Sequence, residues 1–336
     1  MLRYILLALG LIVLSLLVWH IGPANIYEAA TQLGPASLLA ILIPSFMMYS
    51  VEAYGWKVVL GRAAQGVPFW RLMAIRTAGE VVNITTPTAF IGGEPLKVYL
   101  LNKNYQVPIV EGGASVVIAK TTMTISEVFY ILMGIALAFW ILGAGSSAGQ
   151  TITAALLSVG LLVCSIAGFV FIQHRGLFAS ILSLVKKLGL RIKSLEAQEE
   201  HLRSIDQTIQ NFYSHHQKAF YASMGVYFLG WMAESLEVFG IIYLLGGSVS
   251  VLSAFSIGAL AVFIKGGSFF IPGSLGAQDA GNLLLLQAFG YSDVTGITFA
   301  LLRRFRELIW IGIGLLCLAT VGKSRVPQDQ GAESPS

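Results

Sequence analysis

The sequence is too apolar for a water-soluble globule of its length. Of its 336 residues, 56% are hydrophobic and only 11% are charged, and the mean hydropathy is +0.76. Too little polar surface remains to cover a folded chain in water, which excludes a soluble enzyme and indicates a membrane protein. The net charge of +4 then reports which loops stay cytoplasmic, and it does not indicate a nucleic-acid partner.

Six apolar runs approach the ~20 residues that a membrane-spanning helix needs. In chain order they are Leu2–Trp19, Ser37–Leu60, Ala114–Leu142, Thr151–Ile172, Ala219–Leu245 and Thr295–Val321. Two more segments, Leu72–Leu101 and Val251–Phe289, are apolar but interrupted by Gly, Pro and Thr. Such interruptions predict a helix, a break and a second helix, arranged as a broken or re-entrant hairpin. We therefore predict an all-α, polytopic membrane bundle of about six full spans and two hairpins.

The distribution of Lys and Arg orients this bundle. The stretches 20–35, 143–150, 246–250 and 290–293 contain neither and are expected to face outward, whereas seven basic residues lie from Arg175 to Lys218. This predicts a multi-pass protein of the inner (plasma) membrane with both termini cytoplasmic.

The same pattern divides the chain into four predicted parts. These are a membrane half at 1–173, a cytoplasmic amphipathic helical loop at 174–218, a second membrane half at 219–322 and a disordered cytoplasmic tail at 323–336.

One spacing relates the two hairpins. Three residue pairs share a separation of 185 residues: Pro87 and Pro272, Glu94 and Asp279, and Glu52 and Glu237. Each proline falls in a break, each later acid opens the second half-helix, and each earlier acid lies in the preceding span. Because those two spans are predicted to run in opposite directions, the repeats would be inverted, as is common in secondary transporters. The alternative is a coincidental offset.

Ionisable side chains recur within the predicted spans and hairpins. Near the membrane centre each costs ~2.5–3.5 kcal/mol of insertion free energy, so such residues persist mainly where they are paired or functional. They are Glu52, Arg76, Glu80, Lys120, Glu127, Glu234, Glu237, Lys265, Arg303, Arg304, Arg306 and Glu307. Arg76 with Glu80, and Arg303 with Glu307, have i,i+4 spacing, so local neutralisation is one interpretation. We favour a functional role, because replacing buried ion pairs by hydrophobic residues is often neutral or stabilising.

The arginines Arg303, Arg304 and Arg306 are the strongest candidates for binding an anionic group. Guanidinium groups hold phosphate through bidentate hydrogen bonds, while an apolar environment accommodates acyl or prenyl chains. A cytoplasmic turn is the alternative, but it would leave only Leu308–Val321, which is too short for an ordinary span. We therefore predict a headgroup site within the membrane. Further basic residues are assigned to the same site: Arg76, Lys97, Lys120 and Lys265.

The breaks carry the remaining chemistry. In the first, Gly92 and Gly93 permit a tight turn, and Glu94 suits the first turn of the next helix. Free amides at such a helix start can bind an anionic headgroup. Glu94 is either a structural cap or a titratable group that alternates between a proton and a substrate amine, and Asp279 repeats its position. Gating or charge pairing is assigned to the remaining acids and the prolines: Glu52, Glu80, Glu127, Glu237, Glu307, Pro87 and Pro272.

Motifs of catalytic and metal sites are absent from the sequence. It contains no Walker A pattern, no His-Glu-x-x-His and no Gly-x-Ser-x-Gly. Its two cysteines, Cys164 and Cys317, lie in apolar runs and support neither a disulfide nor a metal site. We therefore expect no catalytic residues, no cofactor and no metal, although membrane transferases can work with scattered acids and bases.

Two motifs resemble those of a known family. They are Gly92-Gly-Glu94-Pro-Leu-Lys97-Val-Tyr-Leu-Leu and Pro272-Gly-Ser-Leu-Gly-Ala-Gln-Asp279-Ala-Gly. They are similar to the lysylphosphatidylglycerol synthase transmembrane, or flippase-like, family, and the resemblance covers nearly the whole chain. It implies translocation of lipids between leaflets by a stand-alone membrane region, without the cytoplasmic synthase domain that some members carry. The resemblance does not specify the lipid.

Three hypotheses follow. The first is a lipid translocator that moves a phospholipid, polyprenyl-linked or hopanoid-type lipid between leaflets, with Glu94 and Asp279 as gating or protonatable acids. The second is a membrane-embedded enzyme or accessory subunit of lipid or glycan biosynthesis, and the third is a scaffold whose charges pair internally. The expected partners are membrane lipids, and further candidates are a second copy of the chain or a lipid-biosynthesis enzyme.

Overall fold

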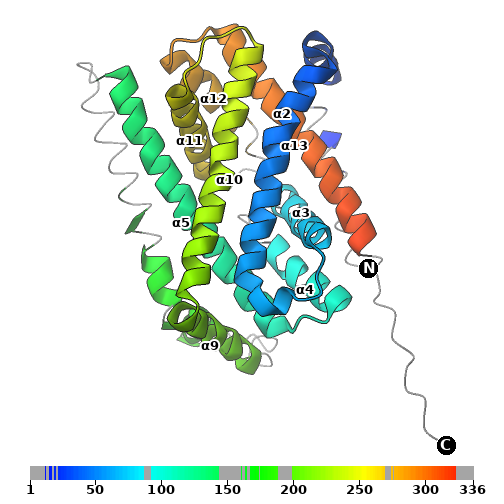
Figure 1. Ribbon diagram of the computed structural model, residues 1–336, viewed down its shortest axis with the longest axis vertical. Coiled ribbons are helices and arrows are strands. Elements are labelled where there is room, and N and C mark those ends of the chain that lie inside the picture. Colours follow the sequence, from blue (N-terminus) through cyan, green and yellow to red (C-terminus); the bar gives the residue numbers. More distant parts are fainter. Residues whose placement is uncertain are drawn as a thin grey trace, which may run out of the picture.

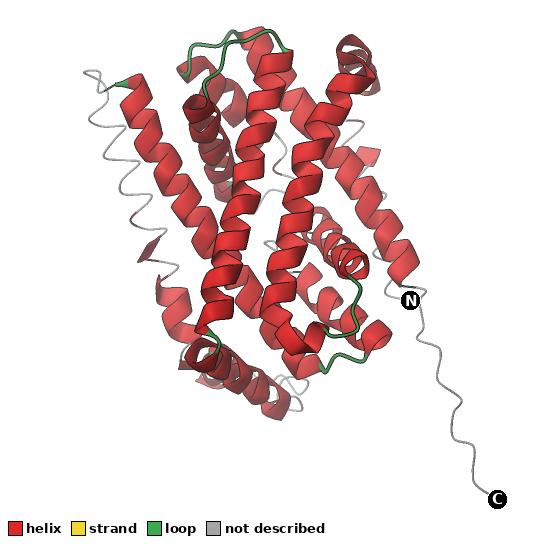
Figure 2. Ribbon diagram, viewed as in Figure 1, coloured by secondary structure: helices red, strands yellow, loops and turns green. Residues whose placement is uncertain are grey.

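The computed structural model describes residues 22–86, 92–143, 167–173, 175–187, 199–268, 274 and 276–322, with isolated positions in 12–19 and 160–164. Within these residues the chain forms helices joined by turns and contains no strand (Figure 2). The predicted all-α class is confirmed. The predicted disordered tail at 323–336 lies outside the described residues.

Four long helices coincide with predicted spans. They are α2 (Pro23–Leu60), α5 (Ile109–Leu142), α10 (Gln217–Leu244) and α13 (Asp293–Val321). By length and apolar composition, α5 and α10 qualify as membrane-crossing helices among the described residues. The other two predicted spans, Leu2–Trp19 and Thr151–Ile172, lie mostly outside the described residues.

The start of α2 differs from the sequence-based expectation. Residues 20–35 were expected only to connect two spans, but the chain is helical from Pro23, and α2 continues for 38 residues. Proline is favoured in the first turn of a helix, where its missing N–H has no helical partner. The residues that follow, Ala-Asn-Ile-Tyr-Glu-Ala-Ala, are mostly compatible with a helix, and α2 also continues through Gly34, Pro35 and Pro44, which ordinarily weaken or kink a helix.

Both predicted hairpins contain a helix on each side of a break. The first consists of α3 (Phe69–Thr85) and α4 (Gly93–Tyr105), which follow the short helix η1 (Gly61–Ala64). The second consists of α11 (Val251–Gly267) and α12 (Ala277–Ala288). The break prolines, Pro87 and Pro272, lie outside the described residues.

The loop predicted to be amphipathic is also helical. It contains α7 (Leu177–Lys187) and α9 (Glu199–His215), and α9 packs against both α7 and α5. Buried Asp206 on α9 accepts the backbone N–H groups of Phe178 (3.1 Å) and Ala179 (2.8 Å). One carboxylate thus satisfies two amides at the start of α7 and fixes the two helices together.

The long helices α2 and α10 pack side by side and antiparallel through the centre of the bundle (Figure 1). The hairpin α3–α4 lies at the same end as α9, and the hairpin α11–α12 lies at the opposite end. Packing between the halves is reciprocal, because α3 packs on α13 and α11 packs on α5. The first helix of each hairpin thus contacts the long helix that follows the hairpin of the other half.

Glycine allows the two helices of the first hairpin to touch. Gly93 at the start of α4 lies against the backbone of Gly79 on α3, and a Cβ atom on Gly93 would overlap the Gly79 carbonyl group. The Gly93 N–H donates to Asn83 Oδ1 at 2.7 Å, which holds the break to α3. Backbone cannot yield as a flexible side chain does, so this approach requires a residue without a side chain.

Gly93→Ala is therefore expected to lower the free energy of unfolding by about 1–3 kcal/mol, as overpacking of a tight core does. Thermal unfolding of the purified protein in detergent measures this. Gly225→Ala on α10 is the matched control, because a Cβ there would meet nothing within 4 Å. Equal melting temperatures for the two variants would contradict the close approach.

Candidate functional site

A cavity of about 690 Å³ lies where the two halves meet. Six helices line it: α2, α3 and α5 from the first half, and α10, α11 and α13 from the second. Much of its wall is apolar, with Met48, Met123, Ile131, Val262 and Phe263 among the lining residues. Ten ionisable residues also line it: Glu52, Arg76, Glu80, Lys120, Glu127, Glu234, Lys265, Arg303, Arg306 and Glu307. This size and this mixture are typical of ligand sites.

Aromatic rings form one side of the cavity. Tyr49 on α2 stacks on Trp310 of α13, with 3.8 Å between ring centroids and 4° between planes. The Trp310 indole N–H donates to Ser45 Oγ at 2.9 Å, and the Arg76 guanidinium lies 5.2 Å from the Tyr49 ring centroid. The sequence analysis missed these aromatic residues, because a tyrosine or tryptophan within an apolar run has no distinguishing signal.

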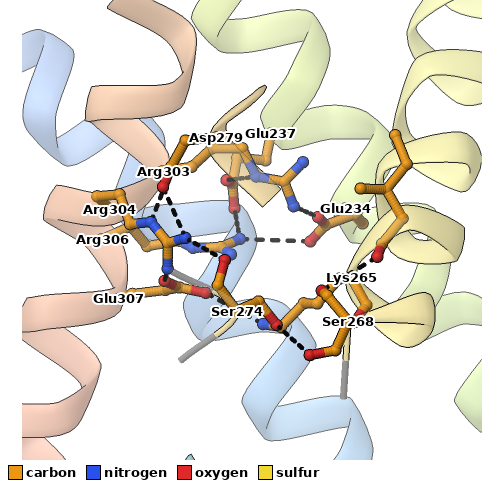
Figure 3. Close-up of polar contacts among 11 residues, drawn as sticks. Glu234, Glu237, Lys265, Ser268, Ser274, Asp279, Arg303, Arg304, Arg306 and Glu307 are labelled. Atoms are coloured by element: carbon orange, nitrogen blue, oxygen red, sulfur yellow. Dashed lines mark hydrogen bonds and ion pairs between the residues drawn. The ribbon is translucent and has the colours of Figure 1, made fainter. Parts of the chain in front are cut away.

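The predicted arginine cluster is engaged with acids from α10 (Figure 3). Arg303 donates to Glu234, and Arg306 donates to Glu237 and, at 3.3 Å, to Glu234. None of the four side chains is more than 8% exposed. Two arginines and two glutamates therefore neutralise each other between α10 and α13. Arg303 still has buried Nε and Nη1 atoms without a hydrogen-bond partner among the described residues.

A second series of ion pairs joins the second hairpin, α11–α12, to α13 (Figure 3). Lys265 donates to Glu307 at 3.1 Å, and Arg304 donates to the other oxygen of Glu307 at 2.7 Å. Arg304 also makes a bidentate contact with Asp279, at 2.7 and 3.0 Å. Asp279 in turn accepts the Gly276 N–H at 3.1 Å. Asp279 therefore caps α12 and binds an arginine at the same time.

The first break is closed by a comparable pair. Glu94 accepts Lys97 Nζ at 2.9 Å on each oxygen, and it accepts Asn83 Nδ2 at 3.1 Å. Asn83 also accepts the Gly93 N–H, so this group ties the start of α4 to α3. Nearby, Arg76 pairs with Glu52 across α3 and α2. Glu94 thus pairs with Lys97 in the first turn of α4, where no side-chain cap bond is made, and both interpretations of its role stay predictions.

Two local pairings considered from the sequence are replaced by contacts between helices. Arg76 is paired with Glu52 and not with Glu80, and Arg303 is paired with Glu234 and not with Glu307. An i,i+4 pair on a helix surface gains only ~0.2–0.5 kcal/mol. Each of these arginines therefore binds the buried glutamate that a facing helix places in direct contact with it, and not the acid on its own helix.

Three ionisable side chains that line the cavity have no ion pair among the described residues. They are Glu80, Lys120 and Glu127, of which Glu80 accepts only a 3.4 Å bond from Asn83 Nδ2. All three are half-buried. They come from α3 and α5, so the open charges of the cavity belong to the first half.

The cavity thus brings together most, but not all, of the predicted site residues. Predicted residues that line it are Arg76, Lys120, Lys265, Arg303, Arg306, Glu52, Glu80, Glu127 and Glu307. Glu94 and Lys97 instead line a smaller adjoining pocket that shares Arg76, Glu80 and Lys120 with the cavity. Arg304, Asp279 and Glu237 are held in the ion pairs around it. Their roles toward a substrate stay predictions.

Removal of one arginine should lower the free energy of unfolding, because it leaves buried glutamates without their partner. Arg306→Ala leaves Glu234 and Glu237 with less compensation, so we expect a loss of about 3–5 kcal/mol in the free energy of unfolding. Denaturant unfolding in detergent measures it, and Arg306→Ala combined with Glu237→Ala should recover part of the loss. The control is Arg203→Ala, because the Arg203 side chain is 62% exposed in its pair with Glu199 and such surface pairs contribute little. Equal losses in the two single variants would contradict this prediction.

Comparison with known proteins finds one family and one curated relative that match most of the chain. A family model described as the lysylphosphatidylglycerol synthase TM region matches residues 4–314. A UPF0104 membrane protein of Methanothermobacter thermautotrophicus is 25% identical over 302 residues, which cover 87% of this chain and 86% of that protein. No solved structure matches the chain. Because the family match includes both hairpins and nearly all of the helices that line the cavity, this chain is a membrane protein of the lysylphosphatidylglycerol synthase transmembrane family.

Proposed function

We propose that this protein moves a lipid between the two leaflets of the membrane, with the polar headgroup passing through the cavity between the halves. The observation that carries the proposal is the cavity itself, which combines apolar walls with ionisable groups from six helices. About 690 Å³ suits a headgroup. The acyl or prenyl chains would stay in the surrounding bilayer, where they need no protein contact.

An inverted repeat would supply the movement. Three features support this part of the proposal: α2 and α10 run antiparallel, the hairpins lie at opposite ends, and the packing between halves is reciprocal. The residues 185 apart also have matching environments. Glu52 and Glu237 each bind a buried arginine, and Glu94 and Asp279 each bind a cation at the start of a half-helix. Rocking of one half against the other would open the cavity to alternate leaflets.

Lys120 is the first contact that we propose for an anionic headgroup. The other cations that line the cavity are in ion pairs with glutamates, whereas Lys120 has none among the described residues. A charge-assisted hydrogen bond to phosphate is therefore available at Lys120 without breaking an existing pair. A second contact that we propose is Arg303 Nη1, which has no hydrogen-bond partner among the described residues.

The cargo that we propose is a phospholipid, a polyprenyl-linked lipid or a hopanoid-type lipid, and the location is the inner (plasma) membrane. Both termini would be cytoplasmic, on the side of the basic segment that contains α7 and α9. We propose transport in preference to catalysis because most charges around the cavity bind one another and do not converge on one reactive side chain.

Transport can be tested in proteoliposomes that contain a phospholipid with a fluorescent headgroup, bleached from outside by dithionite. The wild-type protein should make the inner-leaflet label accessible, whereas empty liposomes protect it. Lys120→Gln should slow this exposure on the order of tenfold or more, since a hydrogen bond to a charged group contributes ~1.5–3 kcal/mol.

The matched control is Lys218→Gln, at an exposed position in the first turn of α10. Unchanged exchange in Lys120→Gln would remove Lys120 from the headgroup path. Protection equal to that of empty liposomes, for phospholipid, polyprenyl phosphate and hopanoid probes alike, would overturn the proposed function.

A further inference from the structure

One acid at the centre of α5 has no role in the ion pairs described above. Glu127 lies 127 − 109 = 18 residues after the start of α5 and 142 − 127 = 15 residues before its end, in a helix long and apolar enough to cross a membrane. Lys120, Thr124 and Ile131 also line the cavity, at spacings of three and four residues that place them with Glu127 on one helix face. Glu127 therefore faces the cavity at mid-helix.

Every other acid that lines the cavity has a partner. Glu52 binds Arg76, Glu234 binds two arginines, and Glu307 binds Lys265 and Arg304. Glu80 accepts a hydrogen bond from Asn83 Nδ2 and shares the small adjoining pocket with Arg76, Lys97 and Lys120. Glu127 has neither an ion pair nor a hydrogen bond among the described residues. Lys120, the nearest cation on the same helix, is two turns away, or about 10 Å at ~1.5 Å per residue.

We propose that Glu127 is a proton-binding site and that the protein carries one proton together with an anionic headgroup; this rests on the proposed transport function. A carboxylate that has no ion-pair partner among the described residues, at the middle of a helix long enough to cross a membrane, is costly to keep ionised, and protonation is the simplest way to remove the charge. Glu94 and Asp279, which the sequence suggested as protonatable acids, are instead held by Lys97 and Arg304.

The charged and titratable groups that face the cavity determine how much a proton on Glu127 changes the net charge of its lining. They are Tyr49 and Glu52 on α2, Arg76 and Glu80 on α3, Lys120 on α5, Glu234 on α10, Lys265 on α11, and Arg303, Arg306 and Glu307 on α13. With Glu127, the lining holds five acids and five cations, so its formal charge is zero when all are ionised. A proton on Glu127 leaves one positive charge in excess.

That excess charge links the proton to the cargo. A headgroup with one negative charge on its phosphate restores neutrality when Glu127 is protonated, and it adds an uncompensated charge when Glu127 is ionised. Each ligand therefore favours the binding of the other, as linkage requires. Proton and headgroup together carry no net charge, so a membrane potential does not oppose their joint movement.

The proton site is tested first without transport. Infrared difference spectra of the purified protein between acid and alkaline pH should contain a protonated-carboxyl band that is lost in Glu127→Gln and shifted in Glu127→Asp. The matched control is Glu111→Gln, which removes an exposed acid in the first turn of the same helix and should leave the band unchanged. A band that persists in a folded Glu127→Gln protein would overturn the inference.

Coupling is tested in proteoliposomes with a phosphatidylethanolamine probe labelled on its nitrogen, so that the headgroup carries only the phosphate charge. A gradient of one pH unit should shift the equilibrium ratio of label between leaflets about tenfold in the wild type. Glu127→Gln should still exchange label but give an equal distribution. Glu111→Gln should behave as the wild type does.

The outcomes separate the two proposals. Exchange of label without any effect of the pH gradient, or a shift driven by sodium in its place, would overturn proton coupling and leave lipid transport standing. A carboxyl band that depends on Glu127, in a protein that moves no lipid, would overturn the transport function and leave the proton site standing.

Discussion

Pairing of buried arginines with glutamates on facing helices is the interaction on which this structure depends. Arg303 and Arg306 on α13 bind Glu234 and Glu237 on α10, and Arg76 on α3 binds Glu52 on α2. Such pairs recover little net free energy relative to apolar packing. They do determine register, because a shift of one helix by a single turn would leave charges without partners in a medium of low dielectric. The pairs therefore specify one arrangement of helices around the cavity.

The two hairpins complete this arrangement by filling the ends of the bundle but not its centre. The contact between Gly79 and Gly93 holds α4 against α3, and the contact of Arg304 with Asp279 holds α12 and α13 together. In both second half-helices an acid in the first turn binds a cation, but Asp279 binds Arg304 on α13 whereas Glu94 binds Lys97 within α4 and reaches α3 through Asn83. The space between them remains open and is lined by both halves of the chain.

The division between paired and open charges gives the cavity its chemistry. Charges of the second half mostly compensate one another, so they provide a fixed, nearly neutral wall. Lys120 and Glu127 on α5, with Glu80 on α3, remain available to a ligand. A headgroup that enters the cavity would displace no existing ion pair at these residues, which supports the proposed transport function.

The amino-acid sequence by itself determined the membrane class, the family and, within the described residues, most of the helix and break positions. Apolar composition and the length of apolar runs are local properties. Glycine and proline indicated both hairpin breaks, although Gly34, Pro35 and Pro44 lie within the continuous helix α2. The resemblance at Gly92–Lys97 and Pro272–Gly281 was confirmed by the family match over residues 4–314. The ionisable residues around the cavity were also identifiable, since a charge in an apolar run stands out.

Only the tertiary structure decided which charges are paired and which are open. Local spacing pointed to Arg76 with Glu80 and to Arg303 with Glu307, but each arginine binds an acid on another helix. The aromatic wall of Tyr49 and Trp310 joins helices far apart in the sequence. Partners of this kind depend on the rotation of one helix against another, which side-chain packing between distant segments sets and no local pattern records.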